Sequence, residues 1–155
     1  NTDHALFVGE KSQVQGTLRC SCDDKNVYFL VEVLDRSLLR GDYATVYLSP
    51  DDSKSLANGA KRIQVSMDGL KSTETYAGKW NSAEMGVEVK TYVCNDTNED
   101  RIDNYGYIAE ISIPRSSLTI SSGQVLVNFS ITDNKEEEAV SDVSSISRWI
   151  PVAGL

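Results

Sequence analysis

The sequence predicts an all-β protein, namely an antiparallel β-sandwich in which two sheets, with about nine to ten strands in total, pack face to face. Three observations predict this fold. Short segments of alternating apolar and polar residues recur along the chain. Turn residues (Gly, Pro, Asn, Asp) separate these segments at intervals of roughly 8–12 residues. No amphipathic stretch is long enough for a real helix.

The segment from Asn26 to Asp35 is the one around which we arrange the others. It is apolar, β-branched and aromatic, which is typical of a strand. Successive side chains of a strand point to opposite faces. One face then carries Val27, Phe29, Val31 and Val33, and the other carries Tyr28, Leu30, Glu32 and Leu34. Because the second face is half apolar too, we expect this strand in the middle of a sheet that is covered on both sides.

The other strands are assigned in chain order as alternating runs bounded by turn residues. Including the central one, strands are expected at residues 4–9, 13–22, 26–35, 42–49, 61–68, 87–94, 107–113, 124–132 and 147–152. Pro114 ends the seventh run because proline has no backbone N–H for a neighbouring strand. One helical turn is expected at 116–118. Residues 70–85 show no clear period, and the acidic segments 95–104 and 133–142 are predicted to be loops.

Length and charge limit the organisation and the partners. A chain of 155 residues fits one domain, residues 1–155, with a core that needs no staples. The net charge of −8 argues against nucleic acid and against anionic membranes, because both require clustered Lys and Arg. No apolar run approaches the ~20 residues of a membrane span. The chain starts at Asn1 rather than Met, so we expect it to be linked to other domains of a longer protein.

Catalysis finds little support in the sequence. His4, the only histidine, stands near the end of the chain, so a relay from serine or cysteine through histidine is not expected. Glu32 and Glu110 could form a glycosidase-like pair. Both lie within predicted strands, and a domain of this size has no deep cleft to desolvate them. We therefore predict that the protein is not an enzyme.

Polar and aromatic residues on three predicted strands form the candidate binding face. They alternate with core positions and are Tyr43, Thr45 and Tyr47, then Arg62, Gln64 and Ser66, then Asn128, Ser130 and Thr132. Any sandwich has a polar outer face, but an ordinary one carries Lys and Glu. Planar amides, a guanidinium and phenol rings instead suit neutral ligands rich in hydroxyl groups. Trp149 and Trp80 could each offer an indole to the apolar face of a sugar, or could be buried in the core.

Several segments together resemble a known family. In order, they are Asp24-x-Asn26-Val27-Tyr28-Phe29-x-Val31-x-Val33-x-Asp35, Asp42-x-x-x-Val46-Tyr47-Leu48-Ser49-Pro50, Arg62-x-x-Val65-x-x-Asp68-Gly69, Tyr105-Gly106-Tyr107-x-x-Glu110-x-x-Ile113-Pro114, and residues 123–134 with Trp149. Their order and spacing, from about residue 13 to the end, resemble the family 9 carbohydrate-binding modules and their relatives in the DOMON-like group.

The resemblance implies an antiparallel sandwich that is secreted as an appendage of a polysaccharide-active enzyme or a surface protein. It also implies bound structural calcium, and no organic cofactor is expected. In the family, aromatic rings clamp a terminal sugar while polar groups on strands hold its hydroxyls. Arg62 and Trp149 match that pattern, whereas positions near Leu39 and at Thr45 lack the family's Trp and Glu. The family's usual ligands, the reducing ends of plant glucans and xylans, therefore do not follow from the resemblance.

We therefore predict a non-catalytic module that binds a glycan or polysaccharide. Trp149 would stack on a pyranose, Arg62 and Gln64 would donate to its hydroxyls, Thr45 and Tyr47 would line the floor, and Trp80 would be a second wall. Four acidic stretches are candidates for calcium, at 23–24, 51–52, 96–103 and 133–134. The third imitates the start of an EF-hand loop, but Arg101 occupies its glycine position.

Two alternatives stay open from the sequence. The first is a structural or adhesion spacer in a multidomain surface protein. The second, weaker one is a DOMON domain that carries haem on Met and His, for which the chain offers Met67 and His4.

Overall fold

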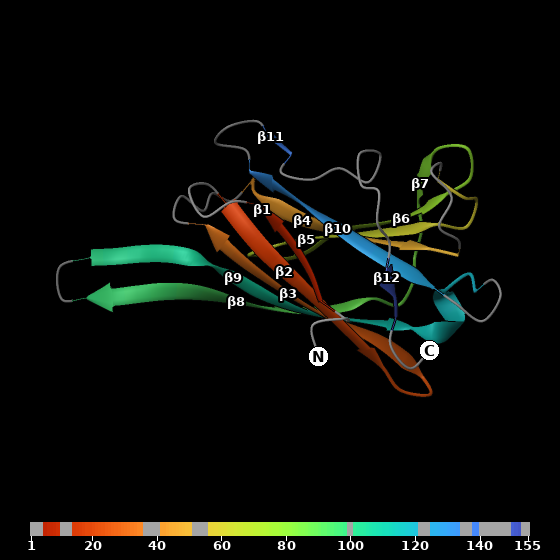
Figure 1. Ribbon diagram of the computed structural model, residues 1–155, viewed down its shortest axis with the longest axis horizontal. Helices are drawn as coiled ribbons and strands as arrows, with labels where there is room; N and C mark the ends of the chain where they lie inside the picture. The colour runs from red at the N-terminus through yellow and green to blue at the C-terminus, as the bar shows by residue number, and fades with distance from the viewer. Residues whose placement is uncertain are drawn as a thin grey trace.

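The computed structural model forms two antiparallel sheets that pack face to face, which confirms the predicted β-sandwich (Figure 1). The structure describes residues 5–9, 14–35, 41–50, 56–98, 101–120, 125–133, 138–139 and 150–152. The strands are β1 (Ala5–Gly9), β2 (Val14–Cys22), β3 (Asn26–Asp35), β4 (Tyr43–Ser49), β5 (Lys61–Ser66), β6 (Gly69–Tyr76), β7 (Trp80–Ser82), β8 (Glu88–Asn98), β9 (Arg101–Pro114), β10 (Leu126–Asp133), β11 (Glu138–Ala139) and β12 (Ile150–Pro151). One sheet has the order β1-β2-β3-β9-β8. The other has the order β11-β10-β4-β5-β6-β7, and β12 also pairs with β10.

Strand β3 is the middle strand of the five-stranded sheet, as the sequence predicts. Its predicted core face is buried, and Val27 and Val31 are fully inaccessible to solvent. The expectation that the sheet is covered on both sides is wrong for the described residues. Tyr28 and Leu34 on the outer face are 38% and 55% exposed. The apolar residues of this outer face therefore lie at the surface instead of under a further layer.

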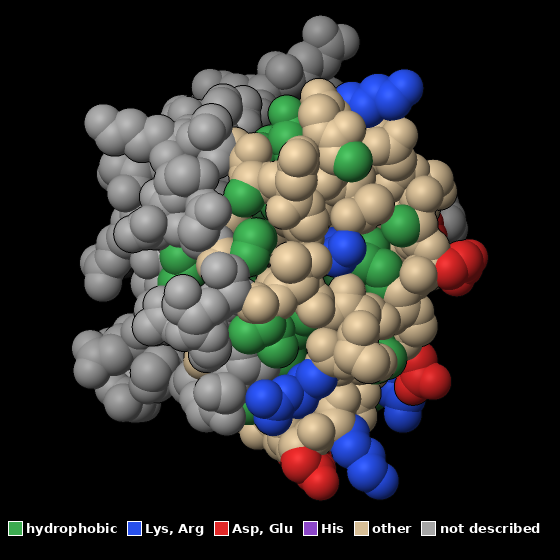
Figure 2. All heavy atoms as spheres, turned by 90° about the vertical axis from the view of Figure 1, so that its right-hand side faces the viewer, with side chains coloured by type: hydrophobic (Ala, Val, Ile, Leu, Met, Phe, Trp, Pro, Cys, Tyr) green, Lys and Arg blue, Asp and Glu red, His purple; other side chains and the backbone are tan. Residues whose placement is uncertain are grey.

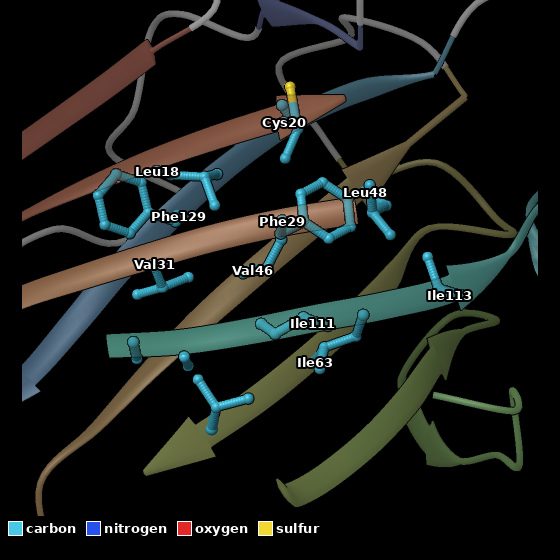
Figure 3. Packing of buried hydrophobic residues seen from close by; sticks show 14 of the residues in the cluster. Leu18, Cys20, Phe29, Val31, Val46, Leu48, Ile63, Ile111, Ile113 and Phe129 are labelled. Carbon is cyan, nitrogen blue, oxygen red and sulfur yellow. The ribbon is translucent and has the colours of Figure 1, made fainter. Parts of the chain in front are cut away.

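The core lies between the two sheets (Figure 3). Leu18 and Phe29 from the five-stranded sheet meet Val46, Ile63 and Phe129 from the other, and each of these side chains is at most 2% exposed. The alternation predicted for β4, β5 and β10 therefore places their apolar residues inward. Burial of these side chains, at about 25 cal/mol per Å² of apolar surface, is the main stabilising term of such a fold.

Residues 70–85, for which the sequence shows no clear period, form a hairpin of β6 and β7 at the edge of the seven-stranded sheet. Trp80, expected in a loop, lies in β7 and pairs with Tyr76 of β6. The predicted strand 61–68 is shorter, because β5 ends at Ser66 and Met67 lies in the following turn. An edge hairpin packs little on the core, so it needs no regular apolar alternation.

Within the segment 95–104, predicted to be a loop, residues 95–98 and 101–104 instead continue two strands. Beyond the sandwich, β8 and β9 run on as a paired arm at the left of Figure 1. The pairing shifts where Cys94 faces Gly106 and Asn95 faces Asn104, so Tyr105 is an extra residue, a β-bulge. Gly106 has φ +133°, and a Cβ there would overlap the carbonyl oxygen of Val33. Only glycine fits this close approach of β9 to β3.

The polar turn before β3 is organised by one carboxylate. Oδ1 of Asp23 accepts hydrogen bonds from the backbone N–H groups of Lys25 (2.8 Å) and Asn26 (2.7 Å). The hydroxyl of Tyr28 donates to Oδ2 at 2.6 Å. The Tyr28 hydrogen bond, followed by the two backbone bonds, lowers the pKa of Asp23 from 3.8 to about 2. The same contact with Asp23 raises the pKa of the Tyr28 phenol above its ordinary value of 10.0.

We expect the stabilising contribution of the Asp23 charge to depend on pH. A carboxyl whose folded pKa is depressed stabilises the fold fully above its unfolded pKa, and this contribution is lost as pH falls from about 4 through about 2. Asp23→Asn keeps a side-chain acceptor but removes the charge. Its stability deficit relative to the unmodified protein, measured by urea unfolding, should be constant above pH 5 and should shrink towards pH 2. A deficit that does not change with pH would contradict this role.

Candidate functional site

The predicted polar residues lie on one side of the seven-stranded sheet, but they are not all at the surface. Those of β5 are partly exposed, whereas Thr45, Tyr47, Asn128 and Ser130 on β4 and β10 are buried, at 8% exposure or less. Strands β10, β4, β5 and β6 are consecutive neighbours, so outward residues at the same level lie side by side. Two such rows cross the sheet. The first contains Asn128, Tyr47, Arg62, Glu74 and Ser82, and the second contains Ser130, Thr45, Gln64 and Ser72. Four predicted residues, Thr45, Tyr47, Arg62 and Gln64, are therefore adjacent.

Arg62 is fixed from two sides. Its Nε donates to Oε1 of Glu74 at 2.7 Å, and its guanidinium carbon lies 4.5 Å from the centroid of the Trp80 ring. The side chains of Arg62 and Glu74 are 25% and 19% exposed, so the pair is largely shielded from water. A guanidinium has five N–H donors, of which this contact with Glu74 uses the Nε–H. Arg62 is thus a pre-positioned donor fork beside a carboxylate acceptor.

Gln64 is the centre of the second row. Its Nε2 donates to Oγ1 of Thr45 at 3.3 Å, and the hydroxyl of Ser72 donates to its Oε1 at 3.0 Å. These contacts fix the orientation of the amide plane. One N–H of an amide nitrogen is enough for Thr45, so the other can serve a ligand.

Thr45 and Tyr47 lie deeper than Gln64 and Arg62, their neighbours on β5. Both are buried, at 1% and 8% exposure, and the hydroxyl of Ser130 donates to the Tyr47 oxygen at 3.5 Å. Thr45 lies against the amide of Gln64, and the Tyr47 ring lies against the Trp80 ring.

Trp80 reaches this surface from β7. Its ring centroid is 6.3 Å from that of Tyr47 and 5.3 Å from that of Tyr76, in tilted and edge-on arrangements. The indole is half-buried, and the Arg62 guanidinium lies over its ring. Trp80 therefore holds Arg62 in place, and a sugar could use only the part of the indole that Arg62 leaves open. Trp149 lies outside the described residues.

Glu74, Ser72 and Tyr76 belong to this surface but escape sequence reasoning. All three lie in β6, which has no apolar alternation to mark it as a strand. The cluster of β-branched and hydroxyl residues between Lys71 and Tyr76 was the available signal.

The described residues offer no candidate metal site, and their charges are mixed in sign. Figure 2 shows Lys and Arg side chains interspersed with Asp and Glu side chains on the coloured part of the face that it views. Within the described ranges, no three His, Cys, Asp or Glu residues are close enough to hold a metal ion, and no helix has the length and hydropathy of a membrane span. Asp23, in the one candidate calcium loop whose side chains are described, already accepts three hydrogen bonds. It is therefore a poor fit for calcium.

The haem alternative has Met67 on the predicted strand 61–68, and the structure does not place it on a strand. Met67 lies in a turn and packs partly buried against the core, where its thioether is an apolar contact. His4, its expected partner, is outside the described residues.

Comparison with known proteins identifies similar sequences and folds. A family model described as carbohydrate family 9 binding domain-like matches residues 2–152. Endo-1,4-beta-xylanase C of Paenibacillus barcinonensis is 28% identical over 121 residues, which is 77% of this chain. The chain spans only 10% of the length of that xylanase.

Two solved structures have a similar fold. Both are of a family 9 carbohydrate-binding module from Caldicellulosiruptor kristjanssonii, one in complex with cellotriose and one with glucose. Each superposes with a TM-score of 0.58 at 17% sequence identity, covering 90% of this chain and 71% or 73% of the module's chain.

Proposed function

The chain belongs to the carbohydrate family 9 binding domain-like family, and from this premise we propose that it is a non-catalytic module that binds a carbohydrate. The observation that carries the proposal is the row in which Arg62 is fixed between Trp80 and Glu74, beside the amide of Gln64. These groups are half-buried and already oriented. Binding therefore need not pay the full cost of ordering them, which favours a ligand with many weak hydrogen bonds.

The chemistry of this row suits sugar hydroxyls. A hydroxyl both donates and accepts, so one hydroxyl can accept from the Arg62 fork while a neighbouring one donates to Glu74. Gln64 offers a further donor. A charged partner makes each such bond worth about 1.5–3 kcal/mol, more than a neutral pair. A neutral, hydroxyl-rich ring is the ligand that uses both signs of this arrangement.

Trp149 keeps its predicted role as the aromatic platform on which a pyranose stacks. Trp80 serves mainly to position Arg62, and its remaining open surface is a partial second wall. Thr45 and Tyr47 form the floor beneath them.

The family and one relative support a proposal about the parent protein. We propose that the chain is part of a secreted multidomain protein and holds a polysaccharide-active enzyme on its substrate. The similarity to a stretch of endo-1,4-beta-xylanase C, a far longer protein, supports this arrangement.

The test is calorimetric titration of the purified protein with cellotriose and with xylotriose, together with an assay for released reducing sugar. Binding of at least one of them without release of reducing ends is the expected result. A chain that binds neither of these, nor any ligand on a broad glycan array, would favour the spacer or adhesion alternative. Hydrolysis would overturn the non-catalytic assignment.

Structural calcium is a separate proposal, supported by the family resemblance and by the acidic residues at 51–52, 96–103 and 133–134. We expect EDTA to lower the melting temperature of the protein and added Ca²⁺ to restore it, because a ligand bound only to the folded state stabilises that state. A melting temperature that neither addition changes would exclude a structural calcium ion.

A further inference from the structure

The outer face of the five-stranded sheet contains a hollow of about 520 Å³, on the sheet opposite to the site proposed above. We propose that this hollow is a second carbohydrate site, which binds a neutral oligosaccharide along the row of strands β2, β3, β9 and β8. The assignment goes beyond the proposed function, because it places a separate ligand on the other sheet. It uses none of the residues of the first site.

Two rows of outward residues form the hollow. Pairing across the sheet aligns Ser21, Tyr28, Ser112 and Glu88 in one row and Arg19, Leu30, Glu110 and Lys90 in the next. All eight residues line the hollow. With strands about 4.8 Å apart, four strands span roughly 14 Å, which suits a short chain of sugars better than a single ring.

Tyr28 provides the aromatic surface. Tyr28 is 38% exposed, and both neighbours in its row, Ser21 and Ser112, are small. Serine on each adjacent strand leaves the sides of the ring open, since cross-strand neighbours are only about 5 Å apart. The hydrogen bond from its hydroxyl to Asp23 fixes the ring in place. An exposed but immobilised aromatic ring is what stacking on a sugar requires.

The charged residues that line the hollow are two cations and two carboxylates. Arg19 and Lys90 supply donors at the two ends of their row, while Glu110 and Glu88 supply acceptors. Glu32 and Asp23 beside the hollow add negative charge, so no excess of positive charge is left to attract a polyanion. Arg19 also contacts Glu32 (3.3 Å), which anchors the guanidinium at the rim. Together with the half-buried Leu30 at its base, the hollow suits a neutral chain with apolar ring faces and polar edges.

The experiment uses the full ¹⁵N-labelled chain carrying Arg62→Met, so that the first site is weakened. Cellohexaose or xylohexaose is added, and amide shifts are followed by NMR. The expected shifts lie at residues 19–21, 28–30, 88–90 and 110–112. Tyr28→Ala should weaken this second binding event by roughly fivefold, as expected for loss of an aromatic contact. Tyr92→Ala is the matched control: Tyr92 lies on the same sheet face, is 53% exposed and does not line the hollow.

A second variant protects the test against misfolding. Ser112→Leu fills the space beside the ring without touching the Asp23 turn, and it should weaken binding like Tyr28→Ala. If neither sugar shifts these amides, or if Tyr92→Ala weakens binding as much as Tyr28→Ala, the second site is wrong.

Titrations of the unmodified protein separate the two sites. Two bound sugars per chain, one lost on Arg62→Met and the other on Tyr28→Ala, support both. A single event lost only on Arg62→Met overturns the second site and leaves the proposed function intact. A single event lost only on Tyr28→Ala leaves the second site and overturns the first.

Discussion

Arg62→Met lowers the affinity of the protein for its sugar by between about tenfold and about a hundredfold, if the proposed site is correct. The variant removes every guanidinium N–H while keeping a long apolar side chain over Trp80. Glu74 then loses its 2.7 Å partner and no longer presents an oriented carboxylate. Calorimetric titration with whichever of cellotriose and xylotriose binds the unmodified protein measures the change.

Lys61→Met is the matched control for that experiment. Lys61 is the neighbouring cation in the same strand, and its Nζ contacts Oγ1 of Thr75, but alternation points it to the other side of the sheet. This variant should bind sugar as the unmodified protein does. Equal losses in both variants would mean a general effect of charge, and an unchanged affinity in folded Arg62→Met would refute the site.

Trp149→Ala, in the same titration, should abolish binding with little change in stability. Unfolding of that variant would show that the indole belongs to the core.

Gly106→Ala should destabilise the protein by about 3 kcal/mol or more. Two effects add at this position. Alanine is strained at φ +133°, and its Cβ would overlap the carbonyl oxygen of Val33 in the central strand. The backbone of β9 can move away only by breaking its pairing with β3, which holds the five-stranded sheet together. Urea unfolding followed by tryptophan fluorescence gives the free energy.

Gly69→Ala separates the two effects. Gly69 has a similar φ of +118°, but a Cβ there would meet nothing within 4 Å. Strain alone should cost about 1 kcal/mol at this turn. If Gly106→Ala lowers the free energy of unfolding no more than Gly69→Ala does, the close approach of β9 to β3 contributes nothing. Our explanation of why residue 106 is glycine would then be wrong.

The alternation in the sequence predicts those parts of the fold that have one buried face. It places β3 at the centre of its sheet and places Thr45, Tyr47, Arg62 and Gln64 on one side of the other sheet, because each of these strands must bury its apolar residues. It does not reveal the partners of those residues. Glu74 orients Arg62, but it lies in β6, a strand with no fully buried residue and hence no periodic apolar signal.

Two errors have one physical origin. Both expectations assume that apolar residues are buried and that polar segments are loops. Leu34 and Tyr28 on the outer face of β3 are exposed. Residues 95–98 pair with residues 101–104 as strands, because backbone hydrogen bonding does not require apolar side chains. In the same way, Trp80 in a polar context lies in a strand, where stacking under Arg62 decides its position.

The arm of β8 and β9 also bears on how densely such modules can gather. Strand β8 ends the order of its sheet, so one side of its backbone lacks a neighbour in the described chain and could template a second copy. The segment Asn95-Asp96-Thr97-Asn98 has no apolar residue that would stabilise the pairing of two such edges. Each molecule also carries a net charge of −8. Mutual repulsion should therefore keep neighbouring copies apart when many are crowded onto one surface.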